Sequence, residues 1–257
     1  MNQAIDCDYS VEGAGPPLFL IHGIGAARDV WRFLTPILSG HFTVVSYDLR
    51  GHGASPMPGG EFGLDDLVVD LERVRERTGF EQAHFAGHSL GGMIGPAYAR
   101  AHPGRVLSLG LLSTAAGRTE DDSAKVWGVV RAMEEKGVEQ VLDTLIGRWY
   151  TDDFARERPD IVQRRLKQVV DTDRAVFLNV FRIYAGTEIM PWLHEVTARS
   201  LVLTGENDGG CNPRLNRGIA GALPNAELVI LPKLKHAILL EDGPAVAGHM
   251  LRFLEVD

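Results

Sequence analysis

The residue best placed for chemistry in this sequence is Ser89, at the centre of the segment Gly87-His88-Ser89-Leu90-Gly91. The apolar run that ends at Gly87 predicts a strand, and the residues after Leu90 predict a helix. A side chain at so sharp a strand-to-helix turn needs a strained backbone, and the flanking glycines leave the space that a Cβ would fill. The pattern therefore predicts a serine hydroxyl at the carboxyl edge of a sheet, where open α/β sheets bind ligands.

A serine hydroxyl becomes a nucleophile at neutral pH only with a base beside it, and the base needs an acid that orients it. Beyond Ser89 the chain supplies Asp208 just after one predicted strand and His236 just after the next. Serine, acid and histidine in this order is the arrangement expected for a nucleophile at such a turn. Glu206 is an alternative acid, but its position nearer the strand favours a structural or substrate-facing role.

Acyl transfer also needs N–H donors for the oxyanion that develops on the substrate. Leu90, at the start of the predicted helix, is one expected backbone donor. Ile24 is the other, because it lies in the segment "HGIG" directly after the first strong strand pattern. His22 is expected to brace this loop rather than act as a base, and His22 and His88 are both candidates for contact with substrate.

The elements that must position these residues alternate along the chain. Continuous apolar runs predict strands buried on both faces, at residues 18–21, 42–47, 84–87, 106–112, 201–205 and 227–232. Apolar residues at helical spacing lie between them, for example from Leu64 to Val74, with Gly79 ending that helix. The alternation predicts an α/β fold with a doubly wound, mostly parallel sheet.

One segment interrupts the alternation, since residues 117–191 show helical periodicity and no good strand. We predict a helical cap there, inserted into a core made of residues 1–116 and 192–257. Substrate contacts are expected from its aromatic residues and arginines, in particular Trp149, Tyr150, Phe177, Phe181, Arg148 and Arg182. The arginines would suit a substrate carboxylate.

The composition narrows the function class. The chain has 257 residues, 45% of them hydrophobic, which is enough for a sizeable core, and a net charge of −8 that disfavours nucleic acid and anionic membranes as partners. Two cysteines are too few for a disulfide framework, and no signal or membrane-spanning pattern is present, so a cytoplasmic protein is expected.

No metal motif stands out, and no cofactor is expected. The expected partner is a small molecule, which can be acidic, and the expected state is a monomer or small homo-oligomer.

Two rival classes remain. The segment "LFLIHGIGAARDVW" imitates a dinucleotide-binding fingerprint, with Asp48 where a ribose-binding acid would lie. Arg28 occupies the position of the last small residue, and this reading leaves Ser89, Asp208 and His236 without a role. The other rival is a non-catalytic binder, against which the complete serine, acid and histidine set argues.

Together the stretches "LFLIHGIG", "VVSYDLRGHGAS", "FAGHSLGG" and "LVLTGEND" resemble the α/β-hydrolase superfamily, along nearly the whole chain. Within it, "YDLRGHGAS" and "RWYTDDF" are most similar to the 3-oxoadipate enol-lactone hydrolases and related small serine esterases. The likeness implies a hydrolase of an ester or enol-lactone, acting through an acyl-enzyme in the catabolism of aromatic compounds. It also implies that Asp48, Arg50 and His52 mostly hold loops in place.

The same likeness leaves alternatives open. A C–C bond hydrolase of ring-cleavage products is the next candidate, although such enzymes usually carry "GFG" where this chain has Gly51-His52-Gly53. An amide hydrolase can use the same three residues. The chain departs from the family at Lys235, where glycine is usual before the histidine, and at Cys211, on the rim of the expected pocket.

Overall fold

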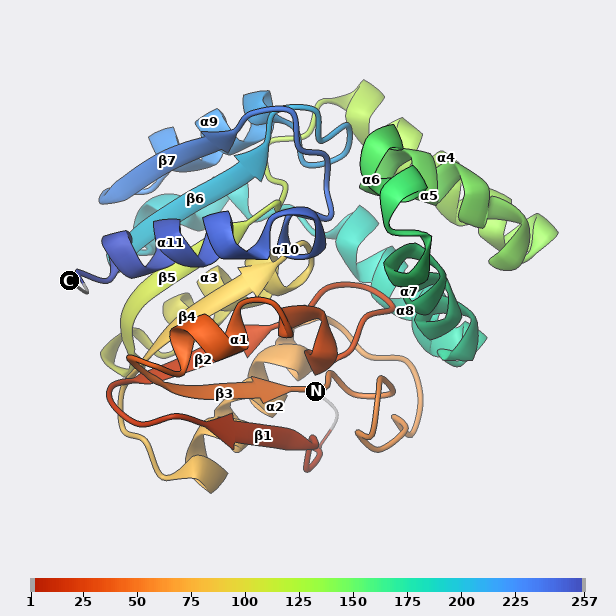
Figure 1. The fold of residues 1–257 in the computed structure, drawn as a ribbon. Helices are drawn as coiled ribbons and strands as arrows, with labels where there is room; N and C mark the ends of the chain where they lie inside the picture. Colours follow the sequence, from red (N-terminus) through yellow and green to blue (C-terminus); the bar gives the residue numbers. More distant parts are fainter. Residues whose placement is uncertain (1–2, 256–257) are drawn as a thin grey trace.

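The computed structural model describes residues 3–255, which form one sheet with helices on both faces and a group of helices at one edge (Figure 1). The sheet has seven strands in the order β1-β3-β2-β4-β5-β6-β7, and only the β1–β3 pair is antiparallel. The strands are β1 (Tyr9–Glu12), β2 (Pro17–Ile21), β3 (Thr43–Tyr47), β4 (Ala83–His88), β5 (Val106–Leu112), β6 (Arg199–Gly205) and β7 (Ala226–Leu231). The predicted α/β fold class is confirmed.

Side chains alternate across the sheet, and this divides the core into two layers. Phe19 and Ile21 of β2 pack on one side with helices α2 (Leu64–Thr78), α3 (Gly91–Ala101) and α9 (Pro213–Ala222). Leu18 and Leu20 pack on the other side with α1 (Thr35–Leu38), α10 (Ile238–Glu241) and α11 (Gly243–Phe253). Burial on both faces explains why the central strands read as continuous apolar runs. As predicted, Gly79 closes α2 at its carboxyl end, where it adopts a φ of 78°.

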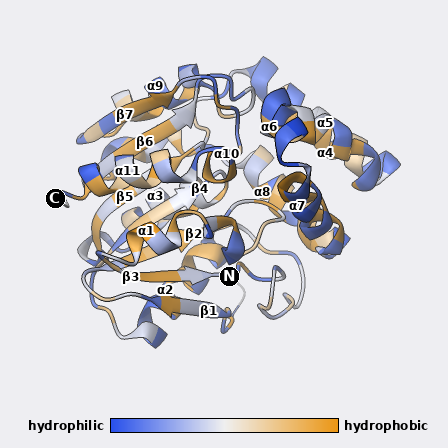
Figure 2. Cartoon of the chain, in the orientation of Figure 1, coloured by the Kyte–Doolittle hydropathy of each residue, from blue (hydrophilic) through white to orange (hydrophobic). Residues whose placement is uncertain are grey.

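Five α-helices lie between β5 and β6 and cover the carboxyl edge of the sheet: α4 (Glu120–Lys136), α5 (Leu142–Trp149), α6 (Asp152–Glu157), α7 (Pro159–Asp171) and α8 (Arg174–Gly186). Thr119 caps α4 by accepting a hydrogen bond from the Asp122 N–H, and Asp173 caps α8 in the same way. Figure 2 shows many hydrophilic residues on α6 and α7, whereas the strands are mostly hydrophobic. We call these five helices the cap. The remaining helical elements are short 3₁₀ helices at Arg28–Trp31, Pro103–Arg105, Glu139–Val141 and Met190–Glu195.

A buried ion pair fastens the loop after β3 to α2. The Arg50 guanidinium donates to both carboxylate oxygens of Asp70, over 2.6 and 2.7 Å, and both side chains are only 1% exposed. Asp70 also accepts from the Ile5 N–H at 2.9 Å. These contacts agree with the structural role expected for Arg50.

We expect Asp70→Ala to lower the free energy of unfolding by about 3–5 kcal/mol, because it leaves a buried guanidinium without its counter-charge. Urea denaturation followed by circular dichroism measures this. Asp6→Ala is the matched control, since Asp6 pairs with Arg73 at 2.9 Å but is 59% exposed, so water replaces the lost partner. Equal effects of the two substitutions would show that burial does not decide the strength of these pairs.

Candidate active site

Ser89 lies at the turn between β4 and α3 with a φ of 57°, a left-handed conformation rare for a residue with a side chain. The neighbouring glycines explain how the chain turns so sharply. A Cβ on Gly87 would come within 2.0 Å of the Gly91 carbonyl oxygen, and one on Gly91 within 2.2 Å of the Ile21 carbonyl oxygen. The Ser89 N–H donates to the Leu112 carbonyl at 2.9 Å, and the Thr114 hydroxyl donates to the Ser89 carbonyl at 2.8 Å. The strained turn is therefore held from the next strand.

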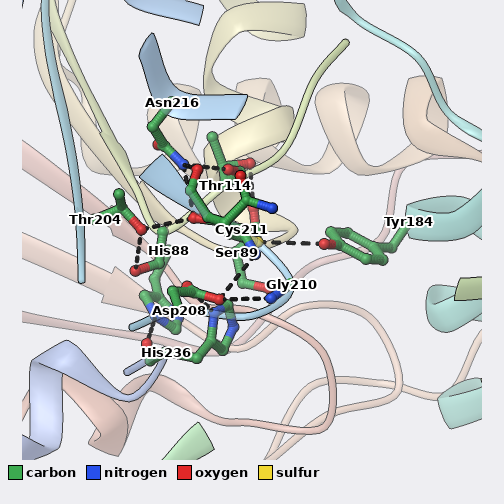
Figure 3. Close-up of polar contacts among 12 residues, drawn as sticks. His88, Ser89, Thr114, Tyr184, Thr204, Asp208, Gly210, Cys211, Asn216 and His236 are labelled. Atoms are coloured by element: carbon green, nitrogen blue, oxygen red, sulfur yellow. Dashed lines mark hydrogen bonds and ion pairs between the residues drawn. The ribbon is translucent and has the colours of Figure 1, made fainter. Parts of the chain in front are cut away.

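His236 and Asp208 form the second part of the site, in the loops after β7 and β6. Nδ1 of His236 lies 2.7 Å from Oδ2 of Asp208 (Figure 3). The other oxygen of Asp208 accepts from the N–H groups of Gly210 and Cys211, at 2.9 and 2.8 Å. Glu206 instead accepts from the Lys233 N–H and has no contact with the ring. Of the two acids considered from sequence, only Asp208 is placed to orient His236.

The charges of this pair support each other. Burial of the imidazole lowers the pKa of His236, but the charge of Asp208 and its hydrogen bond outweigh burial and raise the pKa above 6.5. For Asp208 burial acts in the opposite direction and raises the pKa. The nearby histidine and the two backbone N–H groups outweigh burial and bring the pKa of Asp208 below its ordinary value. Asp208 is therefore ionised at neutral pH. In the neutral form of the ring it holds the proton of His236 on Nδ1, which leaves Nε2 free to accept one.

Backbone contacts fix the position of His236. Nε2 of His88 donates to the His236 carbonyl at 3.0 Å, which is consistent with a neutral ring because burial lowers the pKa of His88 to about 3. The Ala237 N–H donates to the Trp149 carbonyl at 2.8 Å. Lys235, where the resemblance leads to an expectation of glycine, reaches the cap by donating to the Gly147 carbonyl at 2.9 Å and pairing with Asp152 at 3.3 Å. The loop that carries His236 is thus tied to both core and cap.

The loop after β2 approaches Ser89 closely, since a Cβ on Gly23 would lie 2.9 Å from that of Ser89. Ile24 of this loop lines the pocket described below. Leu90 is the first residue of the turn into α3. In the part of the chain that the structure describes, neither the Ile24 nor the Leu90 N–H has an acceptor, which leaves both free for an oxyanion.

Two neutral histidines brace this loop. His22 donates from Nδ1 to the Gly23 carbonyl and accepts from the Leu49 N–H at Nε2, over 2.8 and 2.9 Å. His52 accepts from the Gly25 N–H at 3.2 Å. Burial lowers the pKa of His22 to about 4 and that of His52 to about 3, so both stay neutral. His22 is fully buried and does not line the pocket, so its position fits the expected brace and not the expected substrate contact.

Ser89, His236 and Asp208 border one pocket between the sheet edge and the cap, with an empty volume of about 960 Å³ including its mouth. Four further residues expected beside the substrate line it as well, namely His88, Trp149, Tyr150 and Phe181, and so does Arg148. Phe177 does not line it but packs in the core, where it closes the space beside Gly25.

Arg182 is a correction to the sequence-based expectation. It lies on α8 next to Phe181, but its guanidinium is exposed, pairs with Glu134 at 2.7 Å and lies 3.8 Å from Glu61. The arginine that does enter the pocket is Arg165 of α7, which the sequence reading missed. The sequence did contain a signal for its burial. Arg165 lies four residues from both Ile161 and Val169, and this spacing places it on the same helix face as these two buried residues.

Within residues 3–255, one group of three side chains has metal-ligand chemistry: Asp208, Cys211 and His236, with ligand atoms within 4.8 Å of one another. The sequence reading expected no metal site. One carboxylate oxygen of Asp208 is already hydrogen-bonded to His236, and the other accepts from two backbone N–H groups. A metal would have to break this network, so the geometry favours an acid that orients an imidazole. Cys211 instead contacts the Tyr184 hydroxyl at 3.2 Å.

The geometry also bears on the dinucleotide rival. The backbone of Gly23 lies against Ser89, and Asp48 accepts hydrogen bonds from the N–H groups of Arg28 and Ala54, at 2.7 and 3.0 Å. The acid that a ribose would need is therefore engaged in holding loops.

The fold is that of an α/β hydrolase, and the comparison with known families agrees: the model of the alpha/beta hydrolase fold matches residues 16–243, so the chain belongs to this family. It is 26% identical to 3-oxoadipate enol-lactonase 2 of Acinetobacter baylyi, over 80% of this chain and 77% of that protein. It is 24% identical to (E)-2-((N-methylformamido)methylene)succinate hydrolase of the same organism, over 96% of this chain and 93% of that protein. Among solved structures, the enol-lactonase from Burkholderia xenovorans LB400 is similar with a TM-score of 0.90 and 26% identity, covering 97% and 96% of the two chains. The resemblance seen in the sequence is thus confirmed.

No helix between residues 3 and 255 has the length and apolar character needed to cross a membrane.

Proposed function

We propose that this protein is a serine hydrolase that cleaves a carboxylic ester or lactone of a small molecule. One observation carries the proposal: the strained Ser89 and the hydrogen-bonded Asp208–His236 pair border a single pocket, although Ser89 and His236 are 147 positions apart in the sequence. The backbone N–H groups of Ile24, which lines the pocket, and of Leu90, which follows Ser89, have no acceptor among the described residues and support the proposed oxyanion site.

The proposed reaction has two steps. Nε2 of His236 takes the proton from the Ser89 hydroxyl, whose oxygen attacks the carbonyl carbon, and the N–H groups of Ile24 and Leu90 bind the resulting oxyanion. His236 then protonates the leaving oxygen as the acyl-enzyme forms. His236 then takes a proton from a water molecule, whose oxygen attacks the acyl carbonyl. The bond to the Ser89 oxygen breaks, that oxygen takes the proton back from His236, and the acid is released. Asp208 stabilises the imidazolium at each transfer without becoming protonated.

The choice of ester or lactone draws support from relatives that are enol-lactonases by name. The relative named as a succinate hydrolase acts on an N-methylformamido compound, so a C–N bond is the second bond type to test. No observation in this structure favours C–C cleavage over these.

We expect p-nitrophenyl esters of short acids to give a burst of nitrophenol, about one equivalent per enzyme, whenever deacylation is the slower step. A stopped-flow absorbance trace measures it, and a panel of enol-lactones, anilides and vinylogous diketones run beside it ranks the bond types. Cleavage of the diketones but not of esters or lactones would contradict the proposed bond class.

A further inference from the structure

The charges that line the pocket differ in sign from the protein as a whole. The chain carries a net charge of −8, yet among the described residues the only lysine, arginine, aspartate or glutamate residues that line the pocket are Arg148, Arg165 and Asp208. The Asp208 carboxylate is already engaged by His236 and two backbone N–H groups. Most other lining residues are apolar, for example Val126, Leu145 and Leu240. The pocket therefore presents two arginines in apolar surroundings, which favours an anion.

Arg165 is the more unusual of the two, because it is a buried charged side chain that forms no ion pair with another described residue, although the Asp29 carboxylate acts on it from a longer distance. It is 9% exposed and reaches from α7 to the loop after β2, where Nη2 donates to the Ile24 carbonyl at 2.8 Å and Nη1 donates to the Gly25 carbonyl. The centre of its guanidinium lies 5.0 Å from the centroid of the Trp149 ring. Among residues 3–255, no carboxylate lies within 4.0 Å of it.

The carbonyl contacts use only part of what a guanidinium offers. Arginine has five N–H donors in one plane, and the two carbonyls occupy two of them. A buried cation that lacks an ionised partner carries an uncompensated desolvation penalty. A carboxylate entering the pocket would supply the missing charge and could accept two parallel hydrogen bonds.

Arg148 stands at the same pocket with its own charge available. It is the second-last residue of α5, it is exposed, and it forms no ion pair within the described part of the chain. Arg182, by contrast, is already paired with Glu134. Arg148 can thus attract an anion at the mouth while Arg165 binds it inside.

We propose that Arg165, assisted by Arg148, forms a carboxylate-binding subsite on the cap side of the pocket, so that the preferred substrate is an ester or lactone that also carries a free carboxylate. This inference rests on the proposed hydrolase function. Because Arg165 holds the carbonyls of Ile24 and Gly25, the subsite is joined directly to the loop expected to bind the oxyanion. Arg165 is therefore assigned as a specificity-determining residue.

The kinetic test compares a matched pair of substrates, mono-p-nitrophenyl succinate and p-nitrophenyl butyrate, which differ by a terminal carboxylate. We expect the native protein to prefer the succinate in kcat/KM, and Arg165→Gln to reduce that preference about 10- to 100-fold, as loss of a hydrogen bond to a charged group would. Using the ratio of the two substrates removes any effect of Arg165→Gln on the loop itself. Arg164→Gln is the control, since Arg164 is exposed on the same helix, pairs with Asp29 at 2.8 Å and does not line the pocket.

A binding measurement separates this subsite from catalysis. Titration calorimetry of the Ser89→Ala variant with glutarate should show binding that weakens by the same factor when Arg165→Gln is added, while glutaramide, the neutral analogue, binds neither form measurably. Arg165→Lys, which keeps the charge but not the planar set of donors, should recover part of the affinity. An unchanged substrate preference in Arg165→Gln, or glutarate binding that ignores Arg165, would overturn the subsite. If esters are not cleaved at all but glutarate binds through Arg165, the hydrolase proposal fails and the subsite stands.

Discussion

Replacing Ser89 by alanine is expected to lower kcat for a good ester substrate by on the order of 10⁴- to 10⁶-fold, with a much smaller change in KM. The substitution removes the attacking oxygen and leaves the pocket, the two oxyanion donors and the cap arginines in place. Binding of substrate should persist for that reason. Steady-state kinetics with p-nitrophenyl butyrate, over a range that includes very slow rates, measures both constants.

Ser113→Ala is the matched control for this prediction. Ser113 is also a buried serine with a positive φ, of 44°, at the end of the neighbouring strand β5, but it does not line the pocket. We expect this variant to keep most of the activity. Near-native kcat in Ser89→Ala would remove Ser89 from the mechanism, and equal losses in both variants would point to a general disturbance of the sheet edge.

Asp208→Asn should have the second largest effect, a loss in kcat of about 10⁴-fold. An amide cannot stabilise the imidazolium, and it can donate to Nδ1 and so shift the ring proton to Nε2, where the serine proton must arrive. The hydrogen bonds from Gly210 and Cys211 can still be accepted by the amide oxygen, so the loop after β6 should keep its shape.

The same variant should move the pH profile. The proposed base acts only when unprotonated, so kcat/KM falls as the pH drops through the pKa of His236. Asp208 raises that pKa, which places the acid limb of the native profile above 6.5. Removing the carboxylate should shift the limb to lower pH. Glu206→Gln is the control and should leave both rate and limb unchanged, because Glu206 contacts Lys233 and not the ring. A collapse of activity in Glu206→Gln alone would assign the acid to Glu206.

The parallel part of the sheet could be predicted from sequence because burial on both faces leaves a continuous apolar pattern. The predicted 106–112 strand matches β5 at both ends, and the other five predictions differ from the observed strands by at most two residues at either end. The sequence reading missed β1, which is four residues long, lies at the edge and has no buried residue. Its pairing with β3 depends on residues about 35 positions away, which no local pattern records.

The residues proposed for chemistry could be placed from sequence for a geometric reason. Ser89, Asp208 and His236 each follow a parallel strand, and the carboxyl ends of parallel strands meet at one edge of the sheet. For the helices of the cap, no comparable rule predicts which side chains reach the pocket. Whether Arg165 or Arg182 enters the pocket depends on which face of α7 and α8 meets the core. Arg182 faces away from the pocket and pairs with Glu134 of α4.

The most direct test of the central claim is reaction with a fluorophosphonate followed by intact mass measurement and peptide mapping. We expect one adduct per chain, on the Ser89 oxygen, formed at least a hundred times more slowly in Asp208→Asn and absent in Ser89→Ala. An adduct on another residue, or ester hydrolysis that continues with Ser89 unlabelled, would contradict it.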